Sequence, residues 1–282
     1  MGERLKSGRA GEREKCEYVL GTHDEELRRL GFQHQVWIAA TATAWERARF
    51  GRGQLLLDVG CGPGYATLDL ARLVGERGHV TAVDVSERFL SHLETQLRAR
   101  SITNVTTLSQ DVEDLKLPSR HFDGAYARWV LCFVKNPAAV LRGVARALKP
   151  GGRFVIQDYY QYEAAWIAPE HPVFRKVFQA VDKSWRQRGG NPNIGSVLPE
   201  LLLRNGFEIV EVTPLLRLGR SSDLIWQWPD TFFPIYLGTL IEMKLLSQAD
   251  ATLFLREWKK RSRSPGAFFS TPPMIEIIAV KR

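Results

Sequence analysis

The chain has 282 residues, 44% of them hydrophobic, and a formal net charge of +8, which fits one large domain or a core domain with a cap. No apolar run reaches the roughly eighteen residues that a membrane span needs. The N-terminus has no apolar segment, so the sequence predicts neither a membrane span nor a secretory signal. The three cysteines, Cys16, Cys61 and Cys132, are too few and too widely spaced for a disulfide framework or a zinc site. We therefore expect a cytoplasmic protein without a metal site.

The positive charge is concentrated in residues 256–263, "REWKKRSR". This run continues a helix whose other face carries Leu253, Phe254 and Trp258, so we interpret it as a solvated helix face. Attraction of a nucleic acid or of an anionic substrate is the alternative interpretation.

Residues 1–50 form the first predicted segment, a helical lead-in or cap. Its helix is expected to start at Thr22, with Glu25 completing a capping box. One face of this helix combines polar and apolar residues, namely Leu27, Leu30, His34, Trp37, Thr41 and Trp45.

Residues 51–160 alternate between strand-like and helical runs. The strand-like runs are "QLLLDVG", "HVTAVDV", "VTTLSQD", "FDGAYAR" and "RFVIQDY", and helices are predicted at 65–74, 87–100 and 137–148. Such alternation predicts an α/β fold with a mostly parallel sheet and helices on both faces.

The remaining residues form four predicted segments. Residues 161–193 are a helical insertion, and 194–218 continue the core with a helix closed by Gly206 and a strand, "FEIVEVTPLLRL". Residues 219–265 are a helical lid over the substrate, rich in aromatic side chains, and 266–282 supply the last core strand. Packing against the sheet or a dimer partner is the alternative role of the lid aromatics, which are Trp226, Trp228, Phe232, Phe233 and Tyr236.

The stretch "LLLDVGCGPGYATLDLA" (55–71) predicts a strand, a glycine turn and a helix whose free N–H groups face an anion. It lacks the lysine of a Walker loop, and Tyr65 stands where a dinucleotide fingerprint needs glycine or alanine. Asp58, at the end of the strand, would repel a pyrophosphate and attract an ammonium group. S-adenosylmethionine carries an ammonium, a carboxylate, a ribose and an adenine, so it fits this pattern best.

Two more acids stand at strand ends. Asp84 is placed to accept both ribose hydroxyls, and Asp111 is placed to accept from the adenine amino group, with Val85 and Val112 flanking the purine. A helix cap is the alternative role of Asp84, although Ser86 is better placed to cap. Simple solvation beside other acids is the alternative for Asp111.

At this point the chain resembles the class I S-adenosylmethionine-dependent methyltransferases, through "LDVGCGPG", "VTAVDVS", "SQDVEDL", "FDGAYA" and "LKPGGRFVIQD". It is most similar to their small-molecule branch near the ubiquinone and menaquinone biosynthesis enzymes. The resemblance implies a Rossmann-like, seven-stranded, mostly parallel sheet with a mainly helical cap. It also implies that Asp58, Gly60 and Gly62 hold the methionine end of the cofactor.

The same resemblance implies roles for residues farther along the chain. Asp84 would hold the ribose, Asp111 and Val112 the adenine, and Arg128 and Trp129 the substrate side of the cofactor, while Tyr18 would close over it. The [ND]-P-P-[YFW] element of nucleic-acid amino methyltransferases is replaced by "ARWVL", which argues against base methylation.

Methyl transfer needs alignment and exclusion of water, and a base only if the acceptor holds a proton. The candidate catalytic residues are Asp158, Tyr159 and His34, although His34 also fits a hydrogen-bonded core histidine and Tyr159 fits ordinary packing. We expect a methyltransferase that acts on an O, N or C atom of a small, partly apolar metabolite and binds no specific nucleic acid, with a homodimer left open. The alternatives are an RNA methyltransferase and a non-catalytic S-adenosylmethionine-binding protein.

Overall fold

The structure is a computed structural model that describes residues 24–282. A seven-stranded sheet runs through its centre in the order β3-β2-β1-β4-β5-β10-β7. The first five of these strands are parallel, and β10 is antiparallel to both of its neighbours. The predicted mostly parallel sheet is therefore confirmed. The strands are β1 (Leu55–Val59), β2 (His79–Asp84), β3 (Val105–Ser109), β4 (Phe122–Arg128), β5 (Leu148–Tyr159), β7 (Phe207–Leu215) and β10 (Met274–Lys281).

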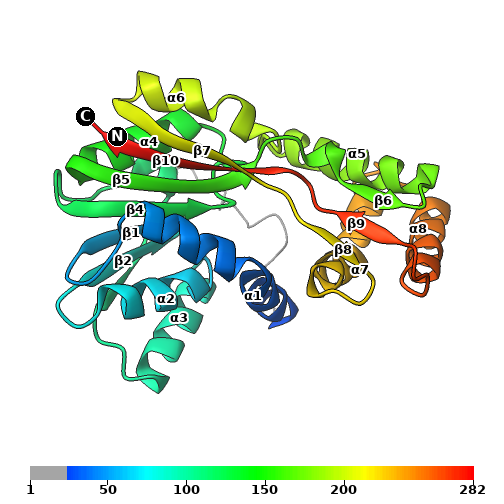
Figure 1. The fold of residues 1–282 in the computed structure, drawn as a ribbon, viewed down its shortest axis with the longest axis horizontal. Helices are drawn as coiled ribbons and strands as arrows, with labels where there is room; N and C mark the ends of the chain where they lie inside the picture. The colour runs from blue at the N-terminus through cyan, green and yellow to red at the C-terminus, as the bar shows by residue number, and fades with distance from the viewer. Residues whose placement is uncertain (1–23) are drawn as a thin grey trace, which may run out of the picture.

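Helices cover both faces of this sheet, as the alternation of the sequence predicts (Figure 1). One group comprises α1 (Asp24–Arg47), α2 (Tyr65–Val74) and α3 (Glu87–Ala99), and the other comprises α4 (Pro137–Ala147) and α6 (Leu198–Arg204). Ser86 caps α3 through an N–H of Phe89, as expected. Gly206 follows α6 with a φ of +82°, a conformation that glycine adopts without strain. The Thr22 cap predicted for α1 lies outside the described residues.

A second group of elements extends beyond the carboxyl ends of the parallel strands (Figure 1). It contains three longer helices, α5 (Pro172–Gln187), α7 (Leu224–Glu242) and α8 (Gln248–Arg261). It also contains a small antiparallel sheet of β6 (Trp166–Ala168), β9 (Phe268–Ser270) and β8 (Leu218–Arg220). The small sheet differs from the prediction, which continued the strand after 207 unbroken to residue 218 and began a helical lid at 219. The six-segment division of the chain itself stays a prediction.

Short single-turn helices complete the described chain at Val112–Asp114 (η1), Tyr162–Ala164 (η2) and Ile194–Ser196 (η3). In α8, Phe254 and Trp258 are buried whereas Arg256, Lys259 and Lys260 are exposed, in line with a solvated basic face. Arg261 departs from that pattern. It is buried and donates to Glu257 and to the backbone oxygen of Pro169.

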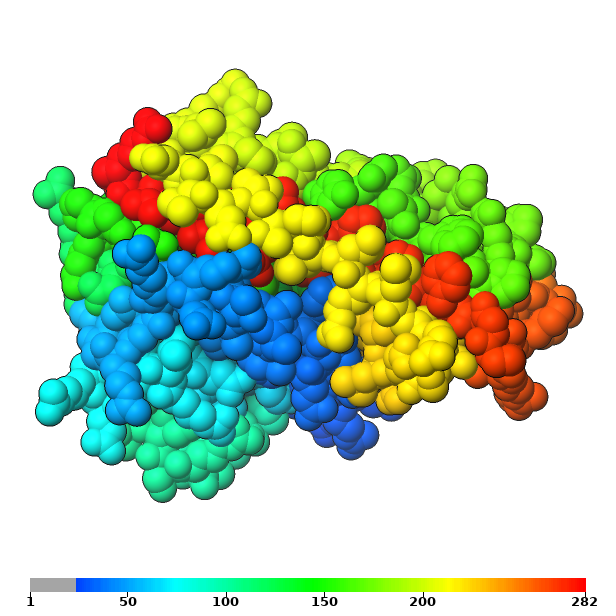
Figure 2. Space-filling model, viewed as in Figure 1, coloured from blue at the N-terminus to red at the C-terminus, as the bar shows by residue number. Residues whose placement is uncertain are grey.

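Helix α1 connects the two groups of elements. It packs beside α2 of the core and beside α7, and α1 and α7 lie next to each other on the face shown in Figure 2. Its buried face combines aromatic residues with charged and amide side chains, among them Glu26, Arg29 and Gln33. A helix that buries such groups must satisfy them with internal partners, so α1 is positioned by polar contacts as well as by packing.

Candidate cofactor and acceptor site

The glycine turn joins β1 to α2, and all three of its glycines have positive φ: +65° at Gly60, +55° at Gly62 and +84° at Gly64. A Cβ on Gly60 would lie 2.6 Å from the Val130 side chain, and one on Gly64 would lie 2.3 Å from that of Leu93. By contrast, a Cβ on Gly62 would meet nothing within 4 Å. Gly60 and Gly64 are therefore required by packing, whereas Gly62 borders open space that a ligand can enter.

Asp58 lies at the end of β1, buried behind the turn. Its Oδ2 accepts a hydrogen bond of 2.6 Å from the Thr67 hydroxyl at the start of α2. Burial raises the pKa of this carboxyl to about 6, although the Thr67 bond opposes the shift. A cation placed beside Asp58 would favour its ionised form, so the site suits an ammonium group.

Asp84, at the end of β2, connects the glycine turn to the next helix. Its Oδ2 accepts from the Gly62 N–H at 2.8 Å, and its Oδ1 accepts from the Ser86 N–H at 2.9 Å. Burial raises the pKa of this half-buried carboxyl, while the backbone bonds oppose the shift. Each carboxylate oxygen has two acceptor positions, so both can still accept a hydroxyl.

The residues predicted to hold an adenine lie on the neighbouring strand ends. Asp111 is exposed and accepts from the Glu113 N–H at 2.9 Å, capping η1. Val112 follows it and is half-buried, and Val85 is 49% exposed. An exposed valine at a strand end is available to a flat apolar ligand, which fits the predicted role. Tyr18 lies outside the described residues.

Arg128, at the end of β4, is held by α1. It donates to the Thr41 hydroxyl and to Nδ1 of His34, both at 3.0 Å, and its guanidinium lies over the Trp129 ring at 4.9 Å. His34 in turn bonds Asp69 of α2 through Nε2 at 2.9 Å. Because a guanidinium only donates, Nδ1 accepts and Nε2 carries the proton. Both ring nitrogens of His34 are thus engaged within the protein.

Asp158 and Tyr159 end β5. The Asp158 carboxylate is 1% exposed, accepts from the backbone N–H groups of Cys132 and Tyr159, and has its pKa raised to about 6 by burial. Burial also raises the pKa of the Tyr159 phenol well above its ordinary value, so this side chain stays protonated. Tyr159 lines a pocket, whereas Asp158 does not line it and instead accepts hydrogen bonds from the neighbouring backbone. The catalytic roles of Asp158, Tyr159 and His34 stay predictions.

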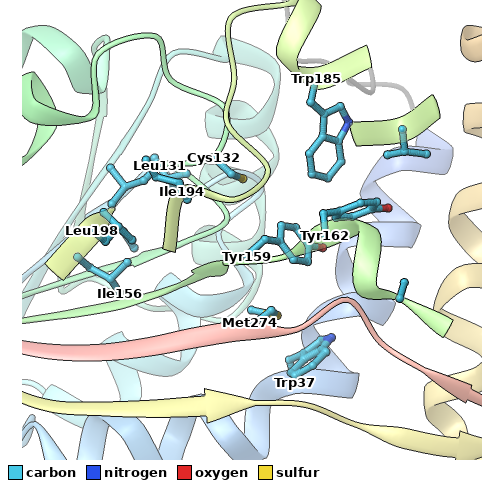
Figure 3. Close-up of a cluster of buried hydrophobic side chains, with 14 of the residues drawn as sticks. Trp37, Leu131, Cys132, Ile156, Tyr159, Tyr162, Trp185, Ile194, Leu198 and Met274 are labelled. Carbon is cyan, nitrogen blue, oxygen red and sulfur yellow. The ribbon is translucent and has the colours of Figure 1, made fainter. Parts of the chain in front are cut away.

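The pocket lies between the strand ends, α1, α5 and α7, and has about 570 Å³ of empty space, counted with its opening to solvent. Tyr159, Tyr162 and Trp185 face one another on one side (Figure 3), with ring centroids 4.7–5.8 Å apart. Its aromatic wall consists of Trp129, Phe133, Tyr159, Tyr162, Phe178, Trp185, Trp228, Phe232, Phe233 and Phe269.

The lid aromatics divide between two roles. Trp228, Phe232 and Phe233 line the pocket. Trp226 instead packs on Trp258 with ring centroids 5.0 Å apart, and Tyr236 is hydrogen-bonded to Ser184 at 2.8 Å. Trp226 and Tyr236 thus contact α8 and α5 rather than the central sheet, and the lid role of this segment stays a prediction.

Sequence reasoning missed the polar wall of the pocket. Arg29 and Gln33 of α1 line it, and Arg29 makes two bonds of 2.6 Å to Glu26 and one of 2.9 Å to Gln33. The spacing of Glu26, Arg29 and Gln33, three and four residues apart, is the signal that could have identified a shared polar face.

The site fits S-adenosylmethionine on three observations. Open space at Gly62 admits its methionine end, the buried carboxylate of Asp58 can pair with its ammonium, and Asp84 retains acceptor positions for its ribose. These groups line the carboxyl ends of parallel strands, where open α/β sheets bind their ligands. Among residues 24–282, no three His, Cys, Asp or Glu side chains gather as metal ligands, and no helix has the length and apolar character of a membrane span.

Comparison with known proteins defines the class. Residues 57–156 match the family described as a methyltransferase domain. This match agrees with the sheet order and the glycine turn, and all three support the class I S-adenosylmethionine-dependent methyltransferase core that the sequence motifs predict.

Among its relatives, the ubiquinone/menaquinone biosynthesis C-methyltransferase UbiE of Shewanella oneidensis is 34% identical over 127 residues, covering 45% of this chain and 48% of that protein. The chain thus spans about half the length of this curated relative. A solved putative methyltransferase from Bacillus halodurans has a TM-score of 0.56 at 19% identity, with 85% and 97% of the two chains covered. The [4+2]-cyclase SpnF has a TM-score of 0.55 at 22% identity, with 86% and 80% covered. These two likenesses confirm the fold.

Proposed function

We propose that the protein transfers a methyl group from S-adenosylmethionine to a nucleophilic atom of a small, partly apolar metabolite. The observation that carries this proposal is the position of the aromatic pocket beside the glycine turn. Val130 would meet a Cβ on Gly60, and the preceding residue, Trp129, is already part of the pocket wall. A ligand in the pocket would therefore lie next to a cofactor bound at the turn.

In this proposal the strand-end acids hold the cofactor. Asp58 faces the ammonium, Asp84 accepts from the ribose hydroxyls, and Asp111 with Val85 and Val112 holds the adenine. Arg128 borders the cofactor on its acceptor side, and Tyr18 covers it. When bound, S-adenosylmethionine supplies an activated methyl group on a sulfonium.

The chain's own contribution is alignment and exclusion of water. The pocket wall is largely aromatic, and among the described lining residues it contains no carboxylate or imidazole. The phenols of Tyr159 and Tyr162 have raised pKa values because they are buried, so they stay protonated and can donate a hydrogen bond. We therefore propose that Tyr159 orients the acceptor, whereas His34 and Asp158 are positioning residues.

The lid belongs to the same proposal. Trp228, Phe232 and Phe233 of α7 line the pocket, which supports a lid that closes over the acceptor. The Shewanella oneidensis relative is named a C-methyltransferase of ubiquinone and menaquinone biosynthesis. Methyl transfer to a carbon atom is therefore the first reaction to test, followed by transfer to oxygen and nitrogen atoms.

The test is a labelled-methyl assay on a bacterial metabolite extract, compared with purified tRNA and rRNA. We expect label in a small molecule that partitions into organic solvent. The matched control is Asp84→Ala, which should lose incorporation because it loses the ribose contact. Label in RNA alone would support the alternative RNA methyltransferase. Tight cofactor binding without turnover on any fraction would support the non-catalytic alternative.

A cytoplasmic location and a homodimer are further proposals. The cysteine content favours a reducing compartment, and Cys61 and Cys132 are free and buried. Light scattering coupled to gel filtration tests the homodimer, since a mass near 32.0 kDa would contradict it.

A further inference from the structure

Trp129 has a buried indole N–H with no hydrogen-bond acceptor among the residues that the structure describes. An indole nitrogen only donates, and a buried tryptophan N–H usually finds a partner. The Trp129 ring forms part of the pocket wall. An unpaired donor in a pocket wall marks a position where a ligand can add a hydrogen bond that the protein leaves unmade.

Trp228 provides a direct contrast within the same wall. Its ring stacks on Trp129, with centroids 6.0 Å apart and an interplanar angle of 24°. Its N–H is satisfied, because it donates to Oε1 of Gln33 at 2.8 Å, and Arg29 donates to the same oxygen at 2.9 Å. Among the tryptophans of the wall, the fold therefore satisfies the N–H of Trp228 and leaves those of Trp129 and Trp185 without an acceptor among the described residues.

The backbone of Trp129 is strained. Its φ is +53°, a left-handed conformation that is unfavourable for a bulky side chain. The backbone N–H of Trp129 donates to the backbone oxygen of Gln157 at 3.0 Å. Such strain persists where the surroundings fix it, and it is concentrated at functional sites. Trp129 combines this backbone with a position in the pocket wall, and the next residue, Val130, borders Gly60 of the glycine turn.

The other polar groups nearby can also donate, although the two phenols can accept as well. The phenols of Tyr159 and Tyr162 remain protonated because burial raises their pKa values. The Arg29 guanidinium is charged and already bonded to Glu26 and Gln33. A wall with this composition is complementary to a ligand that carries hydrogen-bond-accepting oxygen.

We propose that Trp129 is a specificity-determining residue whose indole N–H donates a hydrogen bond to an oxygen atom of the methyl acceptor. The acceptor is then a largely apolar molecule that carries a hydrogen-bond-accepting oxygen. This inference rests on the proposed function, because it takes the aromatic pocket to be the acceptor pocket.

The test uses two probes of similar size, 2-methoxynaphthalene and 2-ethylnaphthalene, which differ by an ether oxygen in place of a methylene. Equilibrium dialysis in the presence of S-adenosylhomocysteine gives the ratio of their affinities. Trp129→Phe keeps an aromatic ring and removes the N–H, so it should lower the preference for the methoxy probe by about fivefold to tenfold, the effect of one hydrogen bond. Trp226→Phe, the matched control, removes an indole N–H that is also without an acceptor among the described residues but lies outside the pocket wall, so it should leave the ratio unchanged.

A second measurement on the unmodified protein does not depend on either variant folding. In nitrogen-15-labelled protein, one indole N–H resonance should move when the methoxy probe is added and stay in place with the ethyl probe. Equal ratios in all three proteins, absence of binding by either probe, or an unmoved indole resonance would overturn the inference. Failure of the proposed function is distinguishable, because it would show as absent methyl transfer while the probe ratio remained sensitive to Trp129.

Discussion

Arg128 and His34 meet where β4 ends against α1, with the guanidinium donating to Nδ1 of the imidazole at 3.0 Å. This contact links the end of β4 to a helix that also lines the aromatic pocket. Thr41 extends the link, since it receives a bond from Arg128 and donates to Oε1 of Gln157 at 2.9 Å. Gln157 then donates to Glu276 at 2.5 Å. The position of α1 over the site therefore depends on a continuous buried polar network.

The first prediction concerns the pH dependence of this network. Burial lowers the pKa of His34 below its ordinary 6.5, and the Arg128 charge adds to the shift. Neutral His34 therefore stabilises the fold fully above pH ~6.5, and this contribution is lost as the pH falls through the lowered pKa. Urea unfolding at neutral and mildly acidic pH should show a larger loss for the natural protein than for His34→Gln. Asp58 and Asp158 have pKa values raised to about 6, so their contributions to stability increase as the pH falls. Both residues are present in both proteins, so their contributions cancel in the comparison. Parallel pH profiles would contradict the prediction.

The second prediction concerns Asp58 and the cofactor. If its carboxylate faces the ammonium, binding requires the ionised form, whose pKa without ligand is about 6. Calorimetry with S-adenosylhomocysteine should show affinity that rises by up to about tenfold per pH unit below this value and levels off above it. Asp58→Asn should be weaker by about 1.5–3 kcal/mol at neutral pH and should lack this dependence.

Thr67→Val is the control for this experiment. It removes the 2.6 Å hydrogen bond that stabilises the ionised Asp58, so the level region should begin at a higher pH. An unchanged profile in both variants would show that Asp58 does not meet the ammonium.

The central fold could be predicted because each of its elements carries a local signal. Buried strands appear as apolar runs, and Ser86 and Gly206 mark helix ends at the expected positions. The carboxyl ends of parallel strands lie on one edge of a sheet, which is why Asp58, Asp84 and Asp111 could be grouped from the sequence.

The small sheet could not be predicted for a physical reason. Its three strands have three residues each and lie far apart in the chain, so none shows a periodicity of its own. Polar burial on α1 was missed because Arg29 and Glu26 satisfy each other within the same helix and appear in the sequence as an ordinary surface pair. Within the predicted face of α1, the structure leaves Leu27 and Leu30 half-buried and buries the other four residues, which are His34, Trp37, Thr41 and Trp45.

A third prediction separates Asp84 from Asp111. Asp84 holds the Gly62 and Ser86 N–H groups as well as the predicted ribose, so Asp84→Ala should lower both thermal stability and cofactor affinity. The affinity loss should be about 1.5–3 kcal/mol. Asp111→Ala removes an exposed side chain and one capping bond, so stability should change by about 0.5 kcal/mol or less. Differential scanning fluorimetry and calorimetry measure the two effects, and equal affinity for Asp84→Ala and the natural protein would refute the ribose role.

The last prediction uses two glycines of one turn as a matched pair. Alanine at Gly62 or Gly64 meets the same backbone penalty of about 1–2 kcal/mol, because both residues have positive φ. At Gly64 the added Cβ would also lie 2.3 Å from Leu93 Cδ1, so this variant should lose clearly more stability. At Gly62 the Cβ enters open space, so the fold should tolerate it while the methyl occupies room that the cofactor needs. Urea unfolding should therefore rank Gly64→Ala as the less stable variant, and calorimetry at a temperature where both are folded should rank Gly62→Ala as the weaker binder. If Gly62→Ala binds S-adenosylhomocysteine as tightly as the natural protein, the open space beside Gly62 does not receive the cofactor.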